Sequence, residues 1–302
     1  MNIFYYGMFE GPGYCENWIA DALNRNGHYC HRIEKTKVKW DDFVSGVGTY
    51  RPDAVLFSKI PEVSEALFGA FRRVYSGKII FWTFDYMRDP SNQWYWPMAP
   101  LADICFQTDG LDHDGYYEDN KVNRVELHQA AAPQHDLPRA LTEEDLGNWE
   151  YDVVFMGSLY HDRRNKLHKY LQGLGVNYKH FGHPEEELWG SDFAKACYFS
   201  KIVIGDNYIN TIPGYWSDRS YLALGCGAFL ITAHVPFIER SFAVGRHLIT
   251  YEAIDDLKTL IEYYLLRESE RKLIALEGYR HVHQHHTYDK RIEVFNSHLR
   301  RL

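Results

Sequence analysis

The sequence lacks the features that mark secreted and membrane proteins. No window of about 18 residues is uninterruptedly apolar, so no segment is expected to span a membrane. The opening residues, MNIFYYGMFEG, have neither the charged start nor the long apolar run of a signal peptide. The scattered cysteines form no CxxC pair, and we interpret them as reduced thiols of a cytoplasmic protein.

Positive charge is also scarce. The formal net charge is −8, which argues against an affinity that rests on a large basic face but leaves room for a local basic groove. Aromatic residues, in contrast, make up 16% of the chain, and they either fill a core or stack on sugars and bases. A length of 302 residues predicts one large domain or two of about 150 residues.

Low-complexity segments and short repeats are absent, and strand-like and helix-like segments alternate instead. The expected strands are residues 2–7, 28–33, 54–60, 78–84, 103–107, 122–129, 152–156, 177–181, 201–205, 228–231 and 247–250. The expected helices are residues 14–26, 61–74, 163–173, 189–200, 254–266, 268–281 and 288–302. This alternation predicts an α/β fold with parallel sheets and helices on both faces.

Residues 130–150 are rich in prolines and acids and interrupt the alternation, which indicates a linker. We therefore predict a Rossmann-like domain over residues 1–135, a linker over 136–150, a second Rossmann-like domain over 151–287 and a terminal helix over 288–302. Ligands of two such domains usually bind in a cleft at the carboxyl ends of the strands, so the residues that follow each strand are the candidates for a site.

One stretch after a strand, Gly214 to Thr232, combines a loop, a short helix and a buried strand. Ser217 or Asp218 can cap this helix, and Arg219 lies in its first turn. Free N–H groups at a helix start and a forked guanidinium suit a phosphate, although an ordinary capped helix has the same pattern.

The second half resembles the C-terminal domain of GT-B glycosyltransferases, in the spore-maturation-protein-like branch of the group 1 transferases. The matching segments are VVFMGSLYHDRR (Val153 to Arg164), YFSKIVIG (Tyr198 to Gly205), GYWSDRSYLALGCGAFLIT (Gly214 to Thr232), PFIERSF (Pro236 to Phe242), LKTLIEYYL (Leu257 to Leu265) and HTYDKRIEVF (His286 to Phe295). In the first half only the αβ pattern, the turn at Gly11 to Gly13 and the strand end at Trp82 to Asp85 fit the family.

The resemblance implies a GT-B fold, in which two Rossmann-like domains face a central cleft and the last helix crosses back to the first domain. It also implies retaining, metal-independent transfer of a hexosyl or pentosyl group from a nucleoside-diphosphate sugar, with a UDP-sugar favoured. The donor is then a substrate, and neither a cofactor nor a metal is expected. Residues 151–287 would bind the donor, and residues 1–135 would bind the acceptor.

A leaving diphosphate gains negative charge, which fixed donors must stabilise when no metal is present. Arg219, the N–H groups of residues 217–221 and the family's basic positions can supply those donors, and the nucleotide base would rest at the Gly182-His183 loop. The expected donor-binding residues are Gly11, Gly13, Gly157, Ser158, Arg163, Gly182, His183, Lys201, Asn207, Tyr215, Ser217, Asp218 and Ser220. Arg219 is also expected to act in catalysis.

The sequence departs from the family at the pair of glutamates that hold the hydroxyls of the donor sugar. The matching positions are Gly214 and Leu222, and neither carries a carboxylate. This departure leaves the sugar unidentified and is compatible with a loss of activity.

In the first half, Asp85 follows the strand KIIFWTF and is the expected catalytic carboxylate, which would accept the proton of the acceptor or orient it. A capping role in the turn before Pro90 explains the same residue. Tyr14, Trp94 and Trp96 are the expected acceptor-binding residues, since aromatic rings stack on sugars and bases, although they also pack in cores.

Two acceptors fit these features: a saccharide, or a hydroxymethylated base in DNA that carries 5-hydroxymethylcytosine. The second would make the chain a viral DNA-modifying enzyme of the host cytoplasm that extracts the base from the stack. A non-catalytic sugar- or nucleotide-binding protein is a further alternative. The histidines from His281 to His286 resemble a metal-binding tract, but we interpret them as structural.

Overall fold

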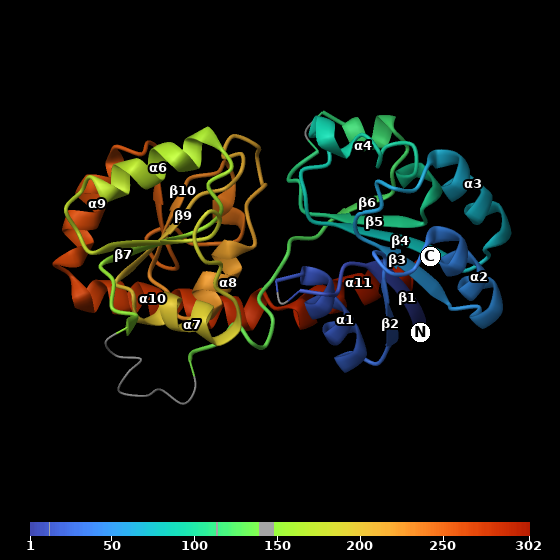
Figure 1. Cartoon of the computed structure of the whole chain (residues 1–302), viewed down its shortest axis with the longest axis horizontal. Helices are drawn as coiled ribbons and strands as arrows, with labels where there is room; N and C mark the ends of the chain where they lie inside the picture. The colour runs from blue at the N-terminus through green and yellow to red at the C-terminus, as the bar shows by residue number, and fades with distance from the viewer. Residues whose placement is uncertain (12, 113, 139–147) are drawn as a thin grey trace. The chain divides into compact units, whose positions relative to one another are not determined.

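The computed structural model describes residues 1–302 except 12, 113 and 139–147. These residues form two compact units: unit 1 consists of Met1–Gln129 and Tyr288–Leu302, and unit 2 consists of Ala130–Thr287. Each unit contains a parallel sheet with helices packed on it (Figure 1). Most of the predicted linker at 136–150 lies outside the described residues.

The sheet of unit 1 has six parallel strands in the order β2-β1-β3-β4-β5-β6. The strands are β1 (Asn2–Gly7), β2 (Tyr29–Glu34), β3 (Ala54–Phe57), β4 (Lys78–Thr83), β5 (Ile104–Gln107) and β6 (Arg124–Glu126). β3 is an apolar run that is buried throughout, as expected for a strand covered by helices on both faces. The chain crosses from β2 over β1 to β3, so the sheet has a topological switch point between β1 and β3.

The helices of unit 1 are α1 (Cys15–Arg25), α2 (Trp40–Tyr50), α3 (Glu65–Val74), α4 (Tyr116–Asp119) and α11 (Tyr288–Leu299), with 3-10 turns at Pro90–Asn92 and Ala99–Leu101. The third of these was predicted to start at Pro61. It starts at Glu65 because the Ser64 side chain accepts a hydrogen bond from the Leu67 N–H. The α2 helix was not predicted, since Gly46 and Gly48 weaken its helical signal.

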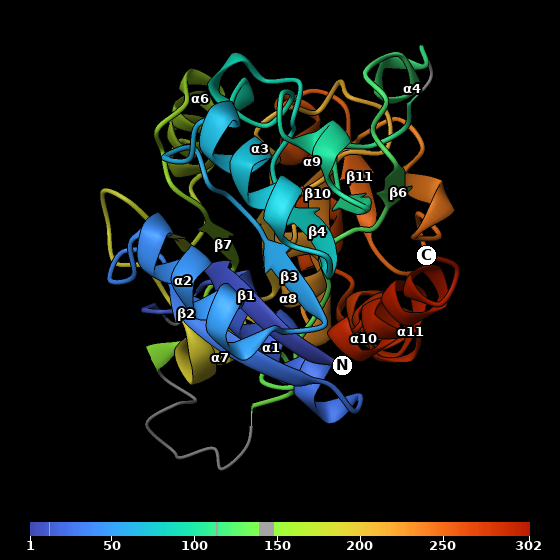
Figure 2. The same cartoon turned by 90° about the vertical axis from the view of Figure 1, so that its right-hand side faces the viewer.

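Aromatic side chains fill both faces of this sheet. On one face, Phe43 of α2 and Phe68 of α3 pack on Phe57 at ring distances of 5.6 and 5.7 Å, and Figure 2 shows these two helices in front of β3 and β4. On the other face, Phe295 of α11 stacks on Trp82 at 5.9 Å. Much of the high aromatic content therefore forms core.

The sheet of unit 2 has five parallel strands in the order β11-β10-β9-β7-β8. The strands are β7 (Val153–Met156), β8 (Tyr178–Phe181), β9 (Ile202–Gly205), β10 (Leu230–Ala233) and β11 (Ile249–Tyr251). The helices are α6 (Asp162–Gln172), α7 (Gly190–Phe199), α8 (Arg219–Gly225), α9 (Asp256–Leu265) and α10 (Glu268–His285), with a 3-10 turn at Ile238–Arg240. The switch point of this sheet lies between β7 and β9.

No helix in the described part of the chain is both long enough and apolar enough to cross a membrane.

Candidate functional site

A buried carboxylate at the switch point organises the polar groups of unit 2. Asp206 directly follows β9, and its side chain is fully buried. Its Oδ1 accepts hydrogen bonds from Arg163 Nε at 2.9 Å, from the Tyr251 hydroxyl at 3.1 Å and from Asn210 Nδ2 at 3.1 Å. These bonds satisfy one oxygen of the buried carboxylate and fix Arg163 at the carboxyl edge of the sheet, whereas the buried Oδ2 has no hydrogen-bond partner in the described structure.

Two guanidinium groups, of Arg163 and Arg164, lie within ion-pair distance of this buried carboxylate, and a third, of Arg219, lies near Arg164. Arg164 is only 7% exposed, and its Nη2 donates to the backbone oxygen of Asp206 at 2.9 Å. Burial, and then the nearby positive charge of Arg219, lower the pKa of Arg164 to about 10. Among the described residues, no carboxylate lies within ion-pair distance of Arg219. The cluster therefore has an excess of positive charge and favours an anion.

Arg219 is the first residue of α8, and the Ser217 hydroxyl fixes it there. Ser217 Oγ accepts from both the backbone N–H and Nη1 of Arg219, each at 3.3 Å. The expectation of free N–H groups at residues 217–221 is corrected here: the N–H of Ser217 donates to Asn207 Oδ1 at 2.7 Å, and that of Tyr221 donates to the Asp218 oxygen at 2.8 Å. Because α8 has only seven residues, guanidinium groups rather than a helix start carry the positive charge.

The loops after β7 and β8 approach each other closely beside Arg164. Gly182 has a φ of +117°, and a Cβ on it would lie 2.7 Å from the carbonyl carbon of Gly157. The Leu159 N–H donates to the oxygen of His183 at 2.8 Å, which ties the two loops together. A side chain at Gly182 is thus excluded. Both glycines are buried, and their N–H groups donate to the oxygens of Phe181 and Glu186 at 2.8 Å each.

Two pairs of rings stand next to these loops. Tyr160 stacks on His183 with ring centroids 4.6 Å apart and an angle of 20° between the planes. His161 contacts Tyr208 at 4.3 Å. Tyr160 is 68% exposed, so its ring offers a free face to a planar or sugar ligand.

The structure does not bring every predicted donor residue to this cluster. Lys201 precedes β9 and therefore lies at the opposite, amino edge of the sheet, where Nζ pairs with Asp152 Oδ1 at 2.7 Å. Ser220 is buried within α8. Tyr215 is close enough to Arg164 to influence its pKa, and the carboxylate of Asp218 accepts from the Ser217 hydroxyl at 3.0 Å.

The positions that replace the family's glutamates are also placed by the structure. Gly214 has a φ of +77°, and its N–H donates to the Pro236 oxygen at 2.8 Å. Leu222 is 4% exposed and packs into unit 2. Neither position offers a side-chain group that could hold a sugar hydroxyl.

Unit 1 has a cavity of about 310 Å³ at the carboxyl ends of β1, β3 and β4. The residues that line it include Gly13, Tyr14, Glu16, Asp85 and Trp94. Trp96 lies elsewhere: its Nε1 donates to the Met87 oxygen, and its ring packs on Tyr116 at 4.7 Å. Gly11 is in the adjoining turn, where its oxygen accepts from Asn17 Nδ2 at 3.2 Å.

The two carboxylates of this cavity differ in their surroundings. Asp85, the predicted catalytic residue, pairs with Lys59 at 2.9 Å, and both side chains are about half exposed. Glu16 was not predicted, yet it is 8% exposed, and burial raises its pKa to about 7, against the opposing effect of backbone N–H groups. Glu16 lies in the first turn of the helix that follows β1, which was the available signal, but an acid at that place is ordinarily explained by the helix dipole.

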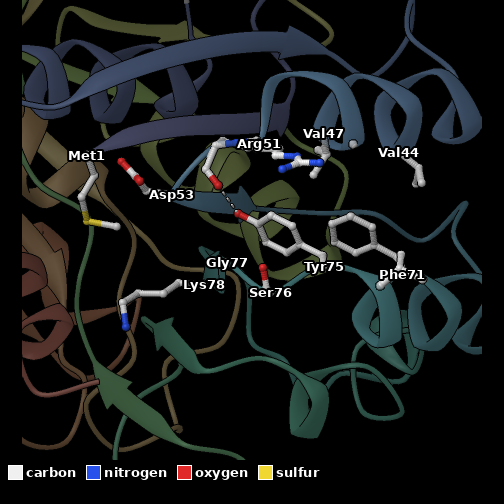
Figure 3. A pocket seen from close by; sticks show the side chains of 13 residues that line it. Met1, Val44, Val47, Arg51, Asp53, Phe71, Tyr75, Ser76, Gly77 and Lys78 are labelled. Atoms are coloured by element: carbon white, nitrogen blue, oxygen red, sulfur yellow. Dashed lines mark hydrogen bonds between the residues drawn. The ribbon is translucent and has the colours of Figure 1, made fainter.

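A larger cavity of about 970 Å³ lies at the opposite edge of the same sheet (Figure 3). Met1, Asp53 and Lys78, which line it, precede or begin β1, β3 and β4. The Tyr75 hydroxyl closes one side by donating to the Pro52 oxygen at 2.9 Å. This cavity is therefore remote from the strand ends where the candidate residues of unit 1 gather.

The histidines near the end of α10 are engaged by the protein itself. His281 Nε2 contacts the Ser241 oxygen at 2.6 Å, and His283 Nε2 contacts the Gly225 oxygen at 3.0 Å. Within the described residues, no three His, Cys, Asp or Glu side chains are arranged to hold a metal ion.

Comparison with known families points to one match. Residues 144–297 match a family model described as glycosyl transferase-like. No curated protein sequence matches the chain.

Several solved structures are similar over the whole chain. Sucrose-phosphate synthase from Thermosynechococcus elongatus has a TM-score of 0.68 at 10% identity, covering 100% of this chain and 99% of that one. Anabaena HepE in complex with UDP and glucose has a TM-score of 0.68 at 11% identity, covering 100% of both chains. An alpha-glucosyltransferase in complex with UDP-glucose and DNA containing an abasic site has a TM-score of 0.62 at 11% identity, covering 98% of both. At such low identities, these similarities establish the fold.

Proposed function

Because the chain belongs to the glycosyl transferase-like family, we propose that it transfers a sugar from a UDP-sugar to a hydroxyl group of an acceptor. The fold is the two-domain GT-B fold, as the similarity to sucrose-phosphate synthase and HepE indicates. UDP is the favoured nucleotide because HepE and the alpha-glucosyltransferase are both described in complex with it or with UDP-glucose. The order of the sequence motifs supports membership of the spore-maturation-protein-like branch.

The observation that carries this proposal is the positive excess at the switch point of unit 2. Arg163 and Arg164 share one carboxylate, Asp206, while Arg219 has no acidic partner in the described structure. In the reaction, the acceptor oxygen bonds to the anomeric carbon, the bond from that carbon to the phosphate oxygen breaks, and the diphosphate leaves with the electron pair and takes up the proton of the acceptor hydroxyl. Fixed guanidinium groups stabilise the charge that develops there, so the proposed transfer needs no metal.

The other residues proposed to contact the donor lie at the same carboxyl edge of the sheet of unit 2. The loops that carry Gly157, Ser158 and Gly182 lie beside Arg164, so the diphosphate would rest against them, while the N–H groups of Gly157 and Gly182 are already bonded within the protein. The stacked rings of Tyr160 and His183 form a surface for the uracil ring. Family resemblance favours retention of the anomeric configuration, and the sugar has to be held without carboxylates at positions 214 and 222.

The acceptor is a saccharide or a hydroxymethylated base in DNA. The second acceptor is supported by the similarity in fold, at 11% identity, to the alpha-glucosyltransferase whose structure contains DNA. A non-catalytic sugar- or nucleotide-binding protein is the alternative that the missing carboxylates favour. A non-catalytic protein would bind the nucleotide sugar without transferring or hydrolysing it, so a measurement of turnover separates the two.

The test is a panel of UDP- and GDP-sugars, with binding measured by calorimetry and products identified by mass. Arg219→Ala should weaken UDP binding roughly tenfold or more, because a charge-assisted hydrogen bond contributes about 1.5–3 kcal/mol, and it should lower turnover about 10²-fold or more. Arg280→Ala is the matched control, since Arg280 is exposed on α10 of the same unit. The proposal fails if no nucleotide sugar binds, or if both variants behave alike.

A further inference from the structure

A row of side-chain hydrogen bonds connects the buried carboxylate of unit 2 to Arg219. Asp206 Oδ1 accepts from Asn210 Nδ2 at 3.1 Å, and Asn210 Oδ1 accepts from Asn207 Nδ2 at 2.9 Å. Asn207 Oδ1 in turn accepts from the Ser217 N–H at 2.7 Å, and the Ser217 hydroxyl accepts from Arg219. We call the side chains of Asn207 and Asn210 the amide bridge.

The groups at the two ends of the amide bridge fix the direction of every bond in it. A carboxylate offers only acceptors, so the Asn210 atom that faces Asp206 must be the donor Nδ2. The backbone N–H of Ser217 is only a donor, so the Asn207 atom that faces it must be the acceptor Oδ1. The Asn207 N–H, 3.3 Å from Asn210 Oδ1, requires the same orientation of the Asn210 amide. The bridge therefore has one consistent arrangement of donors and acceptors.

The segment that the amide bridge spans has no regular structure of its own. From Asp206 to Ser217 the chain forms neither a helix nor a strand, and the helix that follows has only seven residues. The bond from Ser217 to Asn207 closes this segment across ten positions of the sequence. Side chains, rather than a ladder of backbone bonds, thus tie the start of α8 to the carboxyl end of β9.

We infer that Asn210 is a positioning residue of the proposed transfer. Through the amide bridge it holds the Arg219 guanidinium where charge develops on the leaving diphosphate. Asn207 is 2% exposed and both polar atoms of its side chain are bonded in the bridge, so it acts on the donor through Arg219 rather than by contact. The inference rests on the proposed function, since the turnover that it concerns is that transfer. Donors that are fixed before the reaction need no reorganisation when charge develops, so their fixation favours the transition state.

The first test is Asn210→Ala, which removes the bridge but leaves Arg163 and Tyr251 bonded to Asp206. With a sugar donor that gives turnover, kcat should fall about 10- to 10²-fold, because small displacements of a catalytic group have effects of this size. The Kd of UDP should change by less than about threefold, since the guanidinium and its charge are still present. Steady-state kinetics and calorimetry measure the two quantities.

Asn177→Ala is the matched control. It also removes one side-chain amide bond in unit 2, from Asn177 Nδ2 to the Glu150 oxygen at 3.0 Å, but just before β8 at the amino edge of the sheet. It should leave both kcat and the Kd of UDP unchanged.

Asn210→Asp separates the direction of the bonds from the size of the side chain. Aspartate has nearly the same size but cannot donate to Asp206, and it adds a second negative charge there. Turnover should therefore fall at least as far as in Asn210→Ala. In the double variant Asn210→Ala/Arg219→Ala, turnover should be no lower than in Arg219→Ala alone, because the bridge acts through Arg219.

Amide hydrogen exchange at Ser217 tests the bridge without any substrate. Exchange should be about tenfold faster or more in Asn210→Ala than in the wild-type protein, and unchanged in Asn177→Ala, because the Ser217 N–H is bonded to Asn207 Oδ1. The inference is overturned if this exchange is unaffected by Asn210→Ala, if Asn210→Asp retains wild-type turnover, or if the losses add in the double variant. Faster exchange in Asn210→Ala without binding of any nucleotide sugar would reject the proposed function but keep Asn210 as the residue that positions Arg219.

Discussion

The two units share one kind of sheet edge but present opposite charges there. In unit 2, Arg163 and Arg164 share the single carboxylate of Asp206, and Arg219 adds a third positive charge near Arg164. In unit 1, two carboxylates line the cavity, and its one lysine is paired. A parallel sheet with a switch point thus places the residues after its strands together, while the identity of those residues decides which ligand charge is favoured.

The largest expected change in stability comes from removing the charge of Asp206, the carboxylate that Arg163 and Arg164 share in unit 2. Asp206→Asn leaves Arg163 and Arg164 without a counter-charge, and breaking a buried ion pair in this way destabilises by about 3–5 kcal/mol. Chemical denaturation monitored by circular dichroism measures the change. Asp192→Asn, an exposed acid in the first turn of α7, should change stability by less than about 0.5 kcal/mol. Equal losses for the two variants would show that Asp206 is not the organising charge.

In unit 1 the ionised form of the buried Glu16 carboxyl lowers the stability of the fold, whereas the ionised form of Asp206 in unit 2 raises it. Burial raises the pKa of Glu16 from its ordinary 4.5 to about 7, so the folded state favours the protonated form. Its stabilisation is complete below pH 4.5 and is lost as the pH rises through 7. At about 1.4 kcal/mol per pKa unit, the loss is about 3 kcal/mol.

Glu16→Gln, which mimics the protonated form, should therefore be more stable than the wild-type protein by about 3 kcal/mol at pH 8. The two should be nearly equal in stability at pH 4. Denaturant titrations at a series of pH values give the curve, and Lys35, Asp85 and Tyr5 are the charged or titratable neighbours that shape it. A difference that does not vary with pH would contradict the buried-carboxyl description.

A smaller effect is expected where the loops of unit 2 meet. Gly182→Ala should destabilise by about 1–3 kcal/mol and weaken UDP binding, because a Cβ at a φ of +117° would also meet Gly157 at 2.7 Å. Gly245→Ala is the control, since it also has a positive φ, +83°, but open space around the added Cβ. If thermal unfolding and UDP titration give equal results for both, close approach of the loops is not important.

The smallest effect concerns the amino edge of the sheet in unit 2. Lys201→Met removes an exposed pair with Asp152, which contributes roughly 0–1 kcal/mol, and should leave UDP affinity unchanged. Calorimetry with UDP checks this expectation. If Lys201→Met lowers UDP affinity as much as Arg219→Ala does, the assignment of Lys201 to the edge of the sheet away from the donor site is wrong.

The sequence was sufficient to predict which segments follow the strands of unit 2 and therefore lie at the carboxyl edge of its sheet. The segments around Gly157, Gly182 and Arg219 follow strands, and their strand-like and turn-like patterns are local, so the alternation of elements was sufficient to select them. The same local patterns missed α2, in which two glycines hide a helix that Phe43 holds in place through packing. Propensity is a weak guide where tertiary contacts decide.

The partners of charged residues could not be predicted in this way. Arg164 reaches the backbone of Asp206 across 42 positions of sequence, and Lys201 is occupied by Asp152 across 49. The free N–H groups expected at the start of α8 are taken by Asn207 and by its own turn. Likewise, nothing in the sequence around Glu16 distinguishes a buried carboxyl from an exposed one. These properties arise from which segments meet in space.

The position of α11 has a consequence for the order of folding. Phe295 and Tyr288 of this last helix pack on Trp82 in unit 1, whereas all of unit 2 lies between Gln129 and Tyr288 in the sequence. During synthesis, the whole of unit 2 leaves the ribosome before unit 1 receives its final helix. The first half of the nascent chain must therefore wait with part of its apolar surface uncovered, which is the stage at which aggregation and chaperone binding are most favoured.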